Sequence, residues 1–133
     1  IIPDELILVC SNSHEFSKLD AIDLSQLENR DFILREKGSG TRELFENLIK
    51  SKEISINIKW ICNNSEAIKN AVINGQGLTV ISRMLVEKEL KNKKLHAIRI
   101  NDVKLCRTFK LVYHKNKYLS DNLKSFISTC AGK

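Results

Sequence analysis

The strongest constraint on the fold is a regular alternation of strand-like and helix-like segments after residue 30. Short apolar or alternating runs at 31–35, 56–62, 78–81 and 95–100 predict strands. Amphipathic stretches between them predict helices at about 41–51, 65–75 and 82–91. This β-α-β-α-β-α-β order predicts an α/β fold, with a mostly parallel sheet, right-handed crossovers and helices on both faces.

Further elements are predicted on either side of this core. The continuous apolar run 5–10 predicts a strand that is buried on both faces, and residues 19–27 predict a loop or brief helix. Residues 104–114 predict one long strand. A last helix at about 120–130 carries an apolar stripe of Leu123, Phe126, Ile127 and Cys130. A chain of 133 residues is long enough for one domain with a real core.

The formal net charge of +6 would suit nucleic acid, an anionic membrane or a small anion as a partner. The lysines are spread along the chain, and aromatic residues are not interleaved with them, so we favour a solvated surface over a nucleic-acid patch. The four cysteines show no C-x-x-C spacing. We therefore expect reduced, buried thiols, no metal site and no cofactor.

The chain begins with Ile1 rather than Met, which we interpret as a processed chain or a piece of a longer one. Its opening lacks the basic and long apolar regions of a signal peptide. No apolar run approaches the roughly 18 residues that are needed to span a membrane. We expect a soluble, cytoplasmic protein that does not associate with a membrane.

Residues 35–42 read Arg-Glu-Lys-Gly-Ser-Gly-Thr-Arg and join a predicted strand to a predicted helix. The first turn of a helix has free backbone N–H groups and the positive end of the dipole, which together favour an anion. Ser39 and Thr41 could cap the helix or donate hydroxyl hydrogen bonds, Gly40 permits close approach, and Arg42 adds a forked cation. The alternative is plain turn chemistry, with Arg42 only pairing with Glu46 one turn later.

Two other strand-to-helix junctions carry similar polar residues, namely Asn64 and Ser65 at one and Ser82 at the next. Carboxyl ends of parallel strands meet at one edge of a sheet, so these groups predict a small-ligand site there. Segment 35–42 fits neither a P-loop, a dinucleotide fingerprint nor a nucleophile elbow. The three histidines are scattered, and we expect binding groups without catalytic ones.

Taken in order, these segments resemble the second regulatory lobe of LysR-type transcriptional regulators. The resemblance rests on residues 32–42, 64–72 and 75–82, with support from 4–9 and 24–27, and extends from about 4 to 127. It implies an effector-sensing domain with the fold of type-2 periplasmic binding proteins. Such a domain has two α/β lobes, joined by two crossover strands, with the effector in the cleft between the lobes.

The resemblance assigns residues 12–108 to the second lobe. Residues 1–11 and 109–133 become crossover strands and a terminal helix that belong with a first lobe largely absent from the chain. Ser39, Gly40 and Thr41 match the effector loop, while Asn64 and Ser65 match a second contact region. Ser82 stands where many family members have proline.

The resemblance implies a small, often anionic effector, a homodimer or tetramer, and DNA contact only through an N-terminal winged helix-turn-helix outside this chain. We expect no enzymatic activity. One alternative is a solute-binding lobe of a transport system with the same fold. Another is an enzyme lobe of that fold, such as a dehydratase or deaminase.

Overall fold

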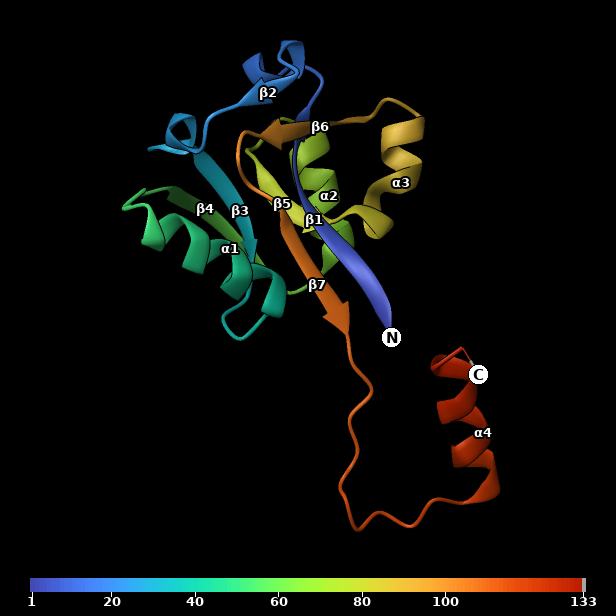
Figure 1. The fold of residues 1–133 in the computed structure, drawn as a ribbon. Coiled ribbons are helices and arrows are strands. Elements are labelled where there is room, and N and C mark those ends of the chain that lie inside the picture. Colours follow the sequence, from blue (N-terminus) through green and yellow to red (C-terminus); the bar gives the residue numbers. More distant parts are fainter. Residues whose placement is uncertain (133) are drawn as a thin grey trace.

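The structure is a computed structural model that describes residues 1–132 (Figure 1). Its strands are β1 (Ile2–Ser11), β2 (Ala21–Ile22), β3 (Asp31–Arg35), β4 (Asn57–Cys62), β5 (Thr79–Ser82), β6 (Leu95–Ile100) and β7 (Leu105–Phe109). Its α-helices are α1 (Gly40–Ser51), α2 (Ser65–Ile73), α3 (Arg83–Lys91) and α4 (Asp121–Cys130). Two short 3₁₀ helices, η1 (Glu15–Lys18) and η2 (Leu24–Leu27), lie between the first strands.

Strand β1 lies at the centre of the sheet. It runs antiparallel to β5 along one edge and to β6 and β7 along the other, and Leu6 pairs with both Ser82 and Leu105. Strand β2 runs parallel to β6, β3 runs parallel to β4, and a parallel bridge joins Phe32 to Leu78 just before β5. Strands β2 to β7 therefore share one direction and β1 opposes them, so the mostly parallel α/β fold is confirmed.

Helices cover both faces, as the alternation predicts. Side chains of β1 alternate between two buried clusters, with Leu6 and Leu8 in one and Ile7 and Val9 in the other. Helix α1 packs on the first cluster, and α2 and α3 pack on the second. The alternation of β1 thus supplies both halves of the core, and the run 5–10 is buried on both faces as predicted.

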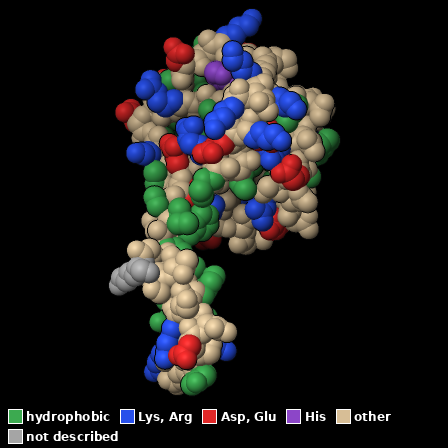
Figure 2. Space-filling view, turned by 90° about the vertical axis from the view of Figure 1, so that its right-hand side faces the viewer, with side chains coloured by type: hydrophobic (Ala, Val, Ile, Leu, Met, Phe, Trp, Pro, Cys, Tyr) green, Lys and Arg blue, Asp and Glu red, His purple; other side chains and the backbone are tan. Residues whose placement is uncertain are grey.

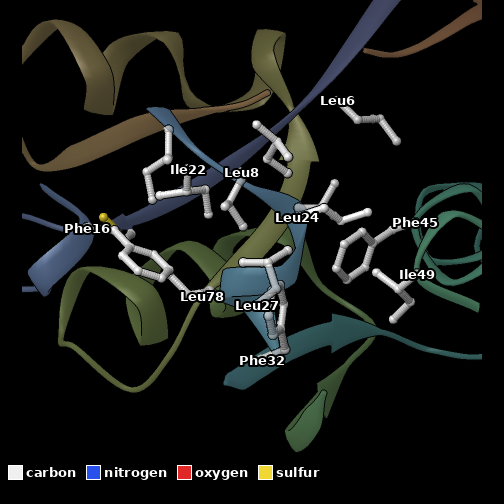
Figure 3. Close-up of a cluster of buried hydrophobic side chains, with 14 of the residues drawn as sticks. Leu6, Leu8, Phe16, Ile22, Leu24, Leu27, Phe32, Phe45, Ile49 and Leu78 are labelled. Atoms are coloured by element: carbon white, nitrogen blue, oxygen red, sulfur yellow. The ribbon is translucent and has the colours of Figure 1, made fainter. Parts of the chain in front are cut away.

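The first cluster centres on an aromatic pair. The rings of Phe32 on β3 and Phe45 on α1 stack with their centroids 5.1 Å apart, and both side chains are fully buried. Figure 3 shows Phe45 and Ile49 pointing from α1 toward Leu27 and Phe32. This contact fixes α1 against β3, and so fixes the loop between them.

A buried lysine joins α2 to α3 on the opposite face. Lys69 Nζ donates to Glu89 Oε1 at 3.0 Å and to the Leu85 carbonyl oxygen at 3.1 Å, and it pairs with Glu66 at 2.6 Å. Burial alone would lower the pKa of Lys69, but the hydrogen bonds to Glu66 and Glu89 outweigh it and raise that pKa above 10.5. The hydrogen bond from Lys69 in turn holds the pKa of Glu89 below 4.5.

The sequence prediction for the last strand is wrong. Residues 104–114 do not form one long strand, because β7 ends at Phe109, which pairs with Ile2 of β1, and residues 110–114 are not in a strand. On α3, Met84 and Leu85 are each 47% exposed, and Val86 is the residue that enters the core.

Beyond β7 the chain leaves the lobe as an arm, and α4 lies apart from the other elements (Figure 1). The predicted apolar stripe is present on α4, but no residue of the helix is buried and Phe126 is 57% exposed. On the face in Figure 2, basic and acidic side chains are interspersed over the lobe, as expected for a solvated surface.

All four cysteines are free. Cys10 is buried in the sheet, and burial raises the pKa of its thiol to about 11. Cys106 is exposed, and Cys62 and Cys130 are only partly buried, so the prediction of buried thiols is confirmed for Cys10 alone. Within residues 1–132, no helix is both long and apolar enough to cross a membrane, and no group of side chains is arranged to hold a metal ion.

Replacing Phe45 with Ala should lower the free energy of unfolding by about 3–5 kcal/mol, because it empties a fully packed site against Phe32. Phe126→Ala on the exposed face of α4 is the matched control and should change stability by less than about 0.5 kcal/mol. Urea denaturation of both variants measures the difference. Equal losses would contradict the assigned core.

Replacing Lys69 with Met should lower the free energy of unfolding by about 1–3 kcal/mol, since Glu89 and the Leu85 carbonyl lose a charged donor. Exposed Lys91→Met is the control. Glu89 has a lowered pKa, so its contribution is present above pH 4.5 and is lost as the pH falls through its folded value. The stability gap between wild type and Lys69→Met, measured by denaturation across pH, should therefore shrink in acid. A stability difference that widened in acid would contradict the proposed contribution of the Lys69–Glu89 contact.

Candidate ligand-binding site at the helix N-termini

The predicted strand-to-helix junctions meet at one edge of the lobe. A small pocket lies where β3 and β5 end and where α1, α2 and α3 begin, and its lining includes Arg35, Thr41, Ser65 and Ser82. The structure therefore brings one predicted residue from each of the three junctions to the same hollow. Parallel strand direction produces this convergence, because it places every following helix start at the same edge.

The loop before α1 contains hydrogen-bond donors that make no capping or intrahelical bond. Gly38 adopts φ +92°, a left-handed conformation that favours glycine, and turns the chain into the helix. Ser39 is the N-cap, but its side chain makes no capping hydrogen bond. The first intrahelical bond runs from Glu43 N–H to the Ser39 carbonyl oxygen at 2.9 Å. The N–H groups of Gly40 and Thr41 precede that bond and remain free for a ligand.

At the second junction, Asn64 caps the helix and Ser65 lines the pocket. The Asn64 side-chain oxygen accepts from the backbone N–H groups of Glu66 at 2.8 Å and Ala67 at 3.3 Å, which caps α2. Asn64 is exposed and does not line the pocket, whereas half-buried Ser65 does. Of this pair, Ser65 is the residue that faces the other two junctions.

Ser82 reaches the pocket wall, but its hydroxyl group is already hydrogen-bonded. The side chain is buried, and Oγ donates to Asp4 Oδ1 at 2.5 Å. It makes no side-chain cap on α3. Ser82 therefore ties the end of β5 to β1.

The two arginines near the loop, Arg35 and Arg42, use their side chains for hydrogen bonds to other protein groups. Arg42 is only 6% exposed; its Nε pairs with Glu46, and its Nη1 donates to the Arg35 carbonyl oxygen at 3.0 Å. The predicted Arg42–Glu46 pair is thus present, although it is buried rather than exposed. Arg35 makes a two-pronged contact with Glu36, at 2.8 and 2.9 Å, and this hydrogen bonding lowers the pKa of Glu36 and raises that of Arg35.

Sequence reasoning missed two residues that border the site. The Asp4 side chain is fully covered and accepts from Arg107 Nε at 2.8 Å as well as from Ser82. Arg107 Nη1 then donates to Thr41 Oγ1 at 3.1 Å. An acidic residue next to the buried run 5–10 needs a hydrogen-bonding or charged partner if it is buried too. The partner of Asp4 lies 103 residues away, and no local sequence pattern identifies it.

The assembled groups suit recognition of an anion. The site offers backbone N–H groups, the hydroxyls of Ser39, Thr41 and Ser65, and the guanidinium of Arg107. None of the histidines lines the pocket, and His14 instead accepts from the Phe16 N–H as the cap of η1. Burial, followed by the charge of Arg30, lowers the pKa of His14.

Comparison with known proteins identifies the family to which this chain is similar. The family model described as LysR substrate binding domain matches residues 1–133. The chain is 30% identical over 125 residues to the HTH-type transcriptional regulator CysL of Bacillus subtilis, covering 94% of the chain and 42% of CysL. It is 35% identical over 132 residues to a probable RuBisCO transcriptional regulator of Nostoc sp., covering 95% and 39% respectively. The chain thus spans about two-fifths of the length of these relatives.

Solved structures show the same fold. The CcmR regulatory domain of Synechocystis, in complex with 2-PG, aligns with a TM-score of 0.83 at 24% identity, covering 98% of this chain and 63% of that one. The effector binding domain of QuiR, in complex with shikimate, aligns with a TM-score of 0.76 at 23% identity, covering 95% and 59%. The fold and the match of the family model over the whole chain agree: this chain belongs to the LysR substrate-binding domain family.

Proposed function

We propose that this chain is the effector-sensing part of a LysR-type transcriptional regulator and that its effector is a small anionic metabolite. The observation that carries the proposal is that Thr41 and Ser65 line one small pocket beside the start of α1, where the Ser39 side chain makes no capping hydrogen bond. A carboxylate, sulfate or phosphate group accepts hydrogen bonds from every one of these donors. A cation could use only the hydroxyl oxygens and would be disfavoured by the free N–H groups at the helix start.

The comparisons support small-molecule sensing. The CcmR regulatory domain is described in complex with 2-PG, and the QuiR domain in complex with shikimate, which carries a carboxylate. Both belong to proteins with which this chain shares its fold. By extension we assign a small anionic ligand to this edge of the sheet; the pocket itself has a volume of about 10 Å³, so such a ligand lies at its mouth and not inside it.

The proposed contacts follow the seven residues that the sequence singles out. Ser39, Gly40, Thr41 and Ser65 donate directly to the effector, and Asn64, which caps α2 outside the pocket lining, keeps its amide nitrogen for a ligand that extends beyond the pocket. Ser82 and Arg42 hold the walls of the site, since their side chains bond to Asp4 and to β3.

We further propose that residues 12–108 form one of two lobes, and that 1–11 and 109–133 belong with the remainder of the domain. The exposed apolar stripe of α4 would then be covered by that remainder. Effector binding shifts the balance between two lobe arrangements in a cytoplasmic homodimer or tetramer, and thereby changes its hold on DNA. The domain acts by sensing and not by catalysis, and DNA contact is made through a winged helix-turn-helix outside this chain.

The effector site is tested by thermal denaturation with sulfate, phosphate, thiosulfate, O-acetylserine, shikimate and 2-PG. A ligand at 100 times its Kd should add about 2.7 kcal/mol to the free energy of unfolding. Ser39→Ala should abolish the shift with little loss of intrinsic stability, because that hydroxyl makes no cap bond. Thr41→Ala should also abolish it, whereas Ser25→Ala, at an exposed position of η2, should retain it.

The panel is run on this chain and on the complete regulator that carries it. A shift in the complete regulator alone assigns half of the site to the other lobe. A shift that survives both Ser39→Ala and Thr41→Ala would contradict the assigned site. No shift with any ligand in either protein would contradict the proposed function.

This chain alone should show no sequence-specific binding to operator DNA, because its described elements all belong to the sensing domain and its arm. Gel-shift titration against the complete regulator measures this. Weak binding that falls steeply with salt and is equal on scrambled DNA would reflect only the +6 charge. A specific complex formed by this chain would count against the assignment of DNA contact to another domain.

A further inference from the structure

We propose that Arg107 is the residue that gives this site its selectivity for anions, by binding a carboxylate or phosphate group of the ligand directly. The inference rests on the proposed function, because it names the charged contact of the same site. It also replaces the sequence expectation that Arg42 is the cation of the loop.

The side chain of Arg107 is held in place by contacts with Asp4 and Phe109. It lies on β7 directly opposite Asp4 of β1, and its Nε donates to Asp4 Oδ2 at 2.8 Å. The other Asp4 oxygen accepts from Ser82, so both oxygens are bonded and the carboxylate is shielded from solvent. The Phe109 ring lies 5.1 Å from the guanidinium carbon. A guanidinium fixed in this way keeps its orientation without a ligand and loses little freedom on binding one.

The guanidinium points at the start of α1. Nη1 donates to Thr41 Oγ1 at 3.1 Å, and a Cβ placed on Gly40 would lie 3.7 Å from the same nitrogen. The cation therefore lies beside the free N–H groups of the first helical turn. Because Thr41 Oγ1 accepts from Arg107, its own O–H remains available to donate to a ligand.

Arg107 also differs from Arg35 and Arg42 in how many of its N–H donors are left without a partner. A guanidinium has five N–H donors, and only Nε and Nη1 of Arg107 make hydrogen bonds in the described chain, which leaves Nη2 open. Arg35 commits Nε and Nη2 to the two oxygens of Glu36. Arg42 is buried and faces Glu46 and the β3 backbone.

The surrounding charges permit this role. Asp4 balances Arg107, but its oxygens are occupied and covered, so it does not face an incoming anion. Glu43 in the first turn of α1 is exposed, and Glu36 is engaged by Arg35. An oxyanion at this position would accept from Arg107 Nη2, the Thr41 hydroxyl and the helix N–H groups together. A neutral ligand would use the same hydroxyl but gain nothing from the charge.

The test compares an acid with its neutral ester. Shikimate, its methyl ester, sulfate and phosphate are titrated into the complete regulator by calorimetry at constant ionic strength. Arg107→Gln should weaken the acid or inorganic anion at least tenfold and leave the ester unchanged, whereas Arg107→Lys should weaken the anion less. Arg99→Gln on β6, an exposed arginine with no ion pair in the described residues, is the matched control and should bind as wild type does.

A second variant separates binding from folding. Arg107→Gln leaves the covered Asp4 carboxylate without its cation, which destabilises the lobe. The double variant Asp4→Asn with Arg107→Gln removes both charges, and a melting curve is recorded to test that it is folded. It should also lose the preference for the anion over the ester.

Wild-type anion affinity in the double variant, or equal affinity of the wild type for acid and ester, would overturn the role of Arg107 and leave the sensor proposal standing. If the wild type binds no probe at all, the proposed function itself fails. Loss of anion binding in Arg99→Gln as well would show a general charge effect and would also overturn the inference.

Discussion

Strand β1 must satisfy both of its edges and both of its faces, and the rest of the lobe is built around that requirement. Its backbone pairs with three strands that all run against it, and its alternating side chains enter the clusters beneath α1 on one face and beneath α2 and α3 on the other. Strands β3 and β4 take the same direction as β5 through their own parallel pairing and the bridge from Phe32 to Leu78, so the helices that follow all three strands begin at one edge. The polar junction therefore depends on β1 for β5 and on the β3–β4 pair for the other two helix starts.

Asp4 shows how the same strand reaches the site. A carboxylate with no solvent exposure is unfavourable unless every oxygen has a donor, and the donors here come from β5 and β7. Their hydrogen bonds hold Ser82 and Arg107 in place, and Arg107 in turn contacts Thr41. The chain of contacts Ser82–Asp4–Arg107–Thr41 joins the ends of two strands to the start of α1, with each step a hydrogen bond.

Sequence reasoning succeeded where the physics is local. Hydrophobic periodicity located α1, β4 and β6 to within about a residue, and cap-type residues located three helix starts. It failed where an outcome depends on pairing. The two-residue strand β2 has too few residues to show a period, and the extent of β7 follows its pairing with the distant strand β1. At the site, Thr41 and Ser65 were found from their junctions, whereas the side-chain contacts of Arg42 and Arg107 depend on neighbours distant in the sequence.

The pairing of Asp4 with Arg107 also has a consequence for how the domain forms. These residues are separated by almost the whole lobe in sequence, so their contact has a high loop-closure cost. Strand β7 and its arginine leave the ribosome after every helix that borders the site. Until then Asp4 has no cation and β1 lacks one of its edge partners. The helix starts that surround the pocket are thus synthesised before Arg107, and the contacts Ser82–Asp4–Arg107–Thr41 form only once β1 and β7 have paired.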